Sequence, residues 1–265
     1  MRPIFFTLFL FALSQGSFCQ DKIIQLKDSI ELYRSTSLEV AGDSNKLMVN
    51  DRLVELWKEI LEMEASQAFD FSDLTRFSIV KDRGVTVVTW NLQLDDFTNT
   101  FYGVVGFDED RKRKAKVLVD GGVSRRSDLQ DIHTNLNWIG ALYYEIVPFK
   151  RKNGWSYLLL GWRGENRLES YKIAEILSLS NRGLNLGLPI LVDKGDRKNR
   201  LIIHYPTSLN YSMRYDEKEE QFYFNRLDIA DESKGYAFNN VTPTYTFDAY
   251  QYKNGKWVKK EGVEV

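Results

Sequence analysis

The chain has 265 residues, of which 43% are hydrophobic and 28% are charged, and its formal net charge is −1 at pH 7. This composition is that of a globular chain with one large β domain or two small ones, which excludes a long disordered protein. The near-neutral charge provides no basic face, so no nucleic-acid partner is expected. The 16 Phe, 14 Tyr and 6 Trp residues suit the faces of β-sheets, and an alternative use is a stacking surface for carbohydrate.

The N-terminal end has the features of an export signal. Arg2 precedes an apolar run over residues 4–13, and a polar stretch follows over residues 14–17. Ten apolar residues are too few to cross a bilayer but match the hydrophobic part of a signal peptide. We therefore predict a signal peptide over residues 1–19. No later apolar run approaches the length of a membrane helix, so no transmembrane segment is expected in the mature chain.

The cleavage site is predicted from the residues that end this segment. Ser17, Phe18 and Cys19 form a small-x-small site, with cutting before Gln20. Cys19 allows a second interpretation as a lipoprotein cysteine, but Phe18 stands where such a site requires a small residue. Simple cleavage leaves a mature chain without cysteine, which must rely on a sizeable core rather than on disulfides. This predicts the periplasm or the outer surface of a Gram-negative bacterium.

Residues 20–70 are predicted to form a helical segment. The apolar positions of a first helix recur at helical spacing: Ile23, Leu26, Ile30 and Tyr33. A second helix is expected over about residues 45–66, with this apolar stripe: Val49, Leu53, Leu56, Trp57 and Ile60. Asp43 or Ser44 is expected to cap its start. Such an amphipathic pair usually packs on its own domain, and partner binding is the alternative.

Residues 71–265 are predicted to form an antiparallel β domain, because the apolar period changes from near four to two at about residue 77. Its first strands are expected over residues 77–80, 85–94, 101–107 and 115–119. Residues 81–84 form a hairpin turn in which Gly84 is available for positive φ. Residues 124–137 are polar and are predicted to form a loop with a short helix, capped near Ser127.

The centre of this domain is a meander of three apolar and aromatic runs, over residues 143–149, 155–162 and 171–179. Four more strands are expected over residues 188–192, 201–205, 211–216 and 221–227. A last hairpin joins residues 244–252 to 257–260 through Asn254-Gly255. Parallel pairing requires crossover helices, and the pattern contains none after residue 137. The fold class is therefore mainly β, a sandwich or a partly closed barrel, with a small propeller-like arrangement as the alternative.

Motifs that carry chemistry are scarce in this sequence. His133 and His204 are the only histidines, which is too few for a recognisable zinc set. The chain has no G-x-S-x-G, no H-E-x-x-H and no phosphate-binding glycine motif. We therefore expect no metal site, no cofactor and no catalytic residue of these classes, and the two histidines are interpreted as residues of the sheet or its loops.

Acidic clusters at the ends of strands support an alternative function, the hydrolysis of glycans. They are Asp95-Asp96, Asp108-Glu109-Asp110, and Asp193 with Asp196. A glycosidase requires two carboxyl groups some 5–10 Å apart, so two of these clusters would have to converge. Acids at strand ends are also ordinary turn residues. None of these acidic clusters matches the ligand pattern of a calcium loop.

Several segments carry a resemblance to a known family. In chain order they are VTVVTWN at residues 85–91, YYEIVP at 143–148, LLLGWRGEN at 158–166, SMRYD at 212–216 and KNGKW at 253–257. Together they resemble a family of uncharacterised secreted proteins of bacteroidete-type Gram-negative bacteria. The resemblance covers most of the β region. It implies export and a β fold, and it implies no activity.

These observations predict a secreted or periplasmic, envelope-associated β domain with a non-enzymatic binding or structural role. The alternative is a glycan-acting hydrolase that uses strand-end carboxylates. The expected partner is an envelope protein or a glycan. Trp162 and Arg163 are the predicted ligand-binding residues, because they end a buried strand where glycines open the backbone into a turn. Trp155 lies at the other end of the same strand, roughly 23 Å away at the rise of a strand, so it cannot share that site.

Intact-mass measurement of the exported protein tests the predicted signal peptide. We expect a mature chain that begins at Gln20, because the apolar run fits export and Cys19 lacks the context of a lipoprotein site. A mature chain that begins at an acylated Cys19 would contradict simple cleavage and would anchor the protein to a membrane.

Overall fold

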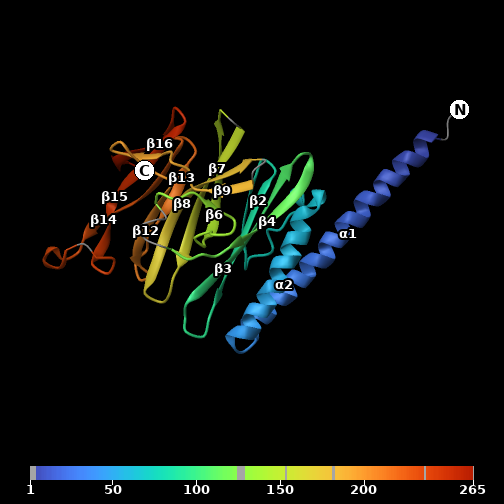
Figure 1. The fold of residues 1–265 in the computed structure, drawn as a ribbon, viewed down its shortest axis with the longest axis horizontal. Coiled ribbons are helices and arrows are strands. Elements are labelled where there is room, and N and C mark those ends of the chain that lie inside the picture. The colour runs from blue at the N-terminus through green and yellow to red at the C-terminus, as the bar shows by residue number, and fades with distance from the viewer. Residues whose placement is uncertain (1–3, 124–128, 153, 181–182, 236, 265) are drawn as a thin grey trace.

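The computed structural model describes residues 4–123, 129–152, 154–180, 183–235 and 237–264. Two N-terminal helices are followed by strands in three sheets (Figure 1). The fold is mainly β, as predicted. The sheets stack face to face in the manner of a sandwich, with the helices outside the first sheet.

The helices are α1 (Ile4–Glu39) and α2 (Asp43–Glu62), followed by the short η1 (Glu64–Gln67). α1 is continuous through the predicted cleavage point, and its N-terminal part extends away from the sheets (Figure 1). Ile23 and Ile30 are buried in the core, and Leu26 and Tyr33 pack against it, so the predicted inner face of this helix is confirmed. In the described residues, no helix combines the length and apolar character that a membrane span requires.

The predicted cap of α2 is wrong. Gly42 occupies the capping position with φ 84°, and no side chain caps the free N–H groups. Asp43 Oδ1 instead accepts a hydrogen bond of 2.9 Å from the backbone N–H of Asp95, which ties the start of α2 to the turn between β2 and β3. A tertiary contact has replaced the local one. Further along α2, buried Asn50 accepts a hydrogen bond of 2.9 Å from the indole of Trp90 in the first sheet.

The first sheet is a meander of four antiparallel strands: β1 (Ser78–Asp82), β2 (Val85–Gln93), β3 (Asn99–Glu109) and β4 (Lys112–Val119). The predicted hairpin turn between β1 and β2 is confirmed, with Arg83 at φ 44° and Gly84 at φ 77°. Positive φ at both central residues matches the twist of the two strands. β2 is buried on both faces, because one face packs on the helices and the other on the next sheet.

The central sheet contains the predicted meander of β6 (Leu142–Arg151), β7 (Gly154–Gly164) and β8 (Glu169–Ser180). Two further strands share the outer edge of β8, namely β9 (Gly183–Leu186) and β12 (Arg200–Pro206). The short β5 (His133–Thr134) pairs with β9. No helix is present in residues 129–137, and Ser127, the predicted cap, lies outside the described residues.

The third sheet has the order β11 (Asp196–Lys198), β10 (Leu191–Asp193), β16 (Lys256–Val263), β15 (Val241–Lys253), β14 (Gln221–Ile229) and β13 (Met213–Asp216). The predicted final hairpin is confirmed, with Asn254 at φ 50° and Gly255 at φ 80° in its turn. Trp257 is 1% exposed and its ring packs edge-on against Phe149 of the central sheet.

Two sequence predictions about the strands need correction. The pair β10–β16 is parallel, although all pairs were expected to be antiparallel. The chain between these two strands runs through the central and third sheets, and this route replaces the crossover helix. The described residues also contain sixteen strands, three more than the thirteen segments expected from the sequence. The missed strands β5, β9 and β11 have two to four residues each, too few to show a period.

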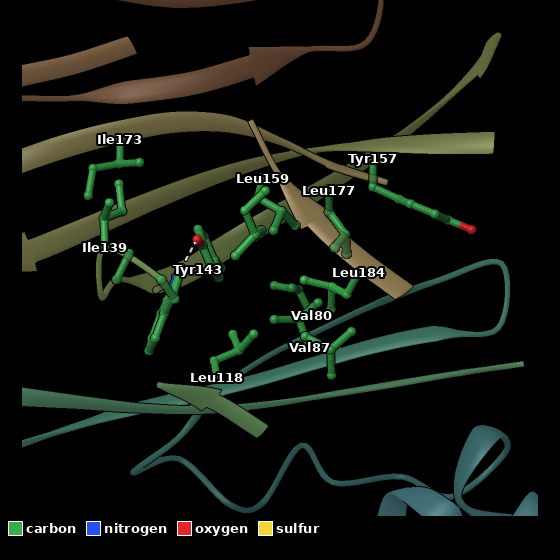
Figure 2. Packing of buried hydrophobic residues seen from close by; sticks show 14 of the residues in the cluster. Val80, Val87, Leu118, Ile139, Tyr143, Tyr157, Leu159, Ile173, Leu177 and Leu184 are labelled. Carbon is green, nitrogen blue, oxygen red and sulfur yellow. Dashed lines mark hydrogen bonds between the residues drawn. The ribbon is translucent and has the colours of Figure 1, made fainter. Parts of the chain in front are cut away.

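Three cores lie between the four layers. The helices and the first sheet enclose one core around Trp57 and Trp90. The first and central sheets enclose the second, where side chains such as Val87 and Leu159 point toward each other (Figure 2). The central and third sheets enclose the third core around Phe222. The predicted helical and β segments therefore share one continuous packing arrangement.

Candidate functional site

Trp162 lines a cleft of about 360 Å³ where the edge of the central sheet meets the first sheet. Tyr144 of β6 also lines the cleft. Its lining further includes Asn91 of β2 and Arg76, which belongs to the segment that leads into β1. The cleft thus combines aromatic rings with an amide and a guanidinium group, which suits a polar ligand with apolar ring faces.

The indole of Trp162 is half-buried and its position is fixed from two directions. It lies against the backbone of Gly164, where an added Cβ would be 2.5 Å from the ring. On the core side, the Trp162 side chain packs against the buried residues of the third core. One edge of the ring is therefore held by the third core while the ring also lines the cleft. Glycine at position 164 is required for this close approach.

Tyr144 is placed in the cleft by a bulge in β6. The register with β7 shifts between Tyr143 and Glu145, which turns Tyr144 outward, and its ring is 39% exposed. Its hydroxyl donates a hydrogen bond of 2.9 Å to the carbonyl of Met213. A bulge is a common device for aiming a side chain at a site.

Lys172 of β8 stands beside Trp162 in the sheet, and its ammonium lies 4.7 Å from the centre of the Tyr144 ring. Burial, together with the nearby charge of Arg214, lowers the pKa of Lys172 to about 8. A cation over an aromatic face is attracted by the ring, so Tyr144 partly offsets the cost of burial. Perturbed lysines of this kind gather at functional sites more often than elsewhere.

Arg163 faces the other side of β7 and does not line the cleft. Its Nη1 donates hydrogen bonds of 2.9 Å to Asp120 Oδ1 and to the carbonyl of Ile139, and its Nε donates one of 2.7 Å to Glu165. The side chain is 4% exposed and lies over the ring of Phe101. Arg163 therefore joins the central sheet to the end of β4, and the structure separates the two predicted ligand-binding residues.

A second buried ion pair was missed in the sequence. Glu175 Oε2 accepts a hydrogen bond of 3.0 Å from Arg200 Nε, and both side chains are fully buried. The other carboxylate oxygen accepts a hydrogen bond from the hydroxyl of Tyr143, which in turn accepts one of 2.7 Å from the indole of Trp138. An acid inside the apolar run of β8 is the signal that could have identified this network.

The two histidines lie in the central sheet and its surroundings, as interpreted from the sequence. His133 is buried in β5. His204 of β12 is stacked between the rings of Tyr171 and Phe238, each with its centre 4.5 Å away. Its Nε2 lies 2.9 Å from Glu169 Oε2. Across the described ranges, no group of three or more histidine, cysteine, aspartate or glutamate side chains is arranged to hold a metal ion.

The strand-end carboxylates lie on separate turns. Asp95 and Asp96 are in the turn before β3, whereas Asp108 lies at the far end of β3, roughly 30 Å along the strand. Asp193 lies in the third sheet. Each cluster has local partners: Lys46 is 2.5 Å from Asp95, Gln67 donates to Asp108, and Lys198 is 3.6 Å from Asp193. No two of these clusters converge on the cleft.

The low pKa of Lys172 predicts a pH dependence of stability. The unfolded chain, with an ordinary lysine pKa of 10.5, binds more protons than the folded chain between pH 8 and that value. The penalty for the half-buried cation is therefore complete below pH 8 and decreases as the pH rises. We expect Lys172→Met to be more stable than the wild type at pH 7, with a difference that shrinks between pH 8 and 10. Urea unfolding at several pH values measures this difference in the free energy of unfolding. Lys256→Met, at an exposed position, is the control. A difference that does not change with pH would contradict a buried Lys172.

Comparison of this chain with protein families, with curated proteins and with solved structures found no match.

Proposed function

We propose that the chain is an exported, envelope-associated binding domain and that its cleft at Trp162 binds a glycan. The observation that carries this proposal is the fixed, half-buried indole beside a polar wall. Sugar rings have apolar faces and hydroxyl edges, so an aromatic ring in the same cleft as an amide and a guanidinium group fits both. The predicted signal peptide and the family resemblance support an envelope location.

Binding is favoured over glycan hydrolysis by the position of the carboxylates. A glycosidase requires two carboxyl groups within about 10 Å of each other on either side of the bond. The predicted candidates stand at opposite ends of β3 and in a different sheet, and each has a partner at its own turn. The cleft is lined by hydroxyl, amide, guanidinium and aromatic groups instead. This lining favours recognition rather than acid–base chemistry.

Fluorescence titration with soluble envelope glycan fragments tests this proposal. We expect the intrinsic tryptophan emission to change on binding, and Trp162→Phe to weaken binding by about tenfold, because the larger indole covers more of a sugar face. Asn91→Ala removes a polar group from the cleft lining without changing an aromatic residue, and it is expected to weaken binding as well.

Trp155→Phe is the matched control, since Trp155 is 41% exposed at the far end of β7 and lies against Arg83. It should bind as the wild type does. Equal affinity in the wild type and in the Trp162→Phe and Asn91→Ala variants would place the glycan elsewhere on the molecule. Absence of any binding across the fragments would contradict the glycan proposal and favour a structural role.

A further inference from the structure

A smaller pocket of about 230 Å³ lies between α1 and the segment that leads into β1. Its lining includes Glu31, Arg34 and Ser35 from the helix, and Asp73 and Arg76 from the segment. Thr75, Arg76 and Phe77 line both this pocket and the Trp162 cleft, so the two hollows adjoin. The volume suits a small ion or one chemical group of a larger ligand.

Arg34 is the unusual residue of this pocket. It is 7% exposed, and among the described residues its Nε and Nη1 have no hydrogen-bond partner. Burial lowers the pKa of Arg34 to about 10, and the nearby charge of Arg76 contributes. The side chain is still protonated at neutral pH. Buried charges are normally paired, because leaving one without acceptors costs several kcal/mol. The Phe77 ring, with its centre 5.6 Å away, offers only a weak substitute for an anion.

The other charges around the pocket do not neutralise Arg34. Arg76 Nη1 donates a hydrogen bond of 3.1 Å to Ser35 Oγ, which holds a second cation at the same site. The carboxylate of Asp73 is bound by Lys27. Glu31 lines the pocket but is exposed, and it forms no ion pair with Arg34 in the described part of the chain. The pocket therefore holds two guanidinium groups, and one of its two acids is already engaged.

We propose that this pocket binds a small oxyanion, a carboxylate or phosphate group, between Arg34 and Arg76. Such a group supplies acceptors for the free donors of Arg34 and balances the charge of both arginines. This site does not depend on the glycan proposed for the Trp162 cleft, because the buried guanidinium group alone requires an anion.

Thermal unfolding of the purified protein with inorganic phosphate or acetate, against chloride at equal ionic strength, tests the pocket. We expect one or both oxyanions to raise the melting temperature, because a ligand that binds only the folded state stabilises it. Arg34→Met should abolish this response, and Arg34→Lys, which keeps the charge but loses most donors, should weaken binding by about tenfold or more. Arg52→Met removes an exposed cation of α2 and should respond as the wild type does.

Three results would overturn the proposal. The first is an equal change in melting temperature with phosphate, acetate and chloride, which would show that ionic strength alone causes the effect. The second is an unchanged oxyanion response in Arg34→Met. The third is a response that appears only in Glu31→Gln, which would make Glu31 the counter-ion of Arg34 in the native chain. Trp162→Phe should keep the oxyanion response, so failure of the glycan proposal and failure of this one are distinguishable.

Discussion

Strand β7 places leucine side chains into two different cores, and the stacking of the three sheets follows from this requirement. Leu159 points into the core shared with the first sheet, whereas Leu158 and Leu160 point into the core shared with the third sheet. All three are fully buried. Because burial of each leucine contributes about 1.5–3 kcal/mol, the central sheet is stable only when a sheet covers each of its faces.

Two buried ion pairs satisfy charged groups inside these layers. The Arg163–Asp120 pair joins β7 to the end of β4, and the Glu175–Arg200 pair lies inside the central sheet. Removing one partner of such a pair leaves a buried charge, at a cost of about 3–5 kcal/mol. Arg34 stands apart from both pairs, since its Nε and Nη1 meet no acceptor among the described residues. The other buried arginines of the described residues, Arg113, Arg163 and Arg200, are all paired with acids, which is why the external anion is proposed at Arg34.

Local patterns predicted much of the fold. The three-strand meander follows from its aromatic runs, the two hairpin turns follow from glycine at positive φ, and the leucine run indicates a sheet covered on both faces. Long-range contacts account for most of the misses. The cap of α2 was wrong because Asp43 bonds to a distant turn, and the parallel pairing of β10 with β16 depends on the whole intervening chain.

The candidate site could be predicted only in part. Trp162 was identified from the glycines around it, and it lines the cleft. The buried position of Arg163 could not be deduced, because its partner Asp120 is 43 residues away in the sequence. Tyr144 and Lys172 were missed for a similar reason. The bulge that turns Tyr144 outward, and the burial that perturbs Lys172, are produced by packing between elements rather than by any local motif.

Native-state hydrogen exchange, resolved by residue, tests the layered arrangement most directly. Because both faces of β7 are covered, the amides of Leu158, Leu159 and Leu160 should exchange only when the whole protein unfolds. Their opening free energy and its dependence on denaturant should then equal those of global unfolding. Exchange of these amides through a smaller opening, while the helices and the first sheet stay protected, would contradict a central sheet held from both sides.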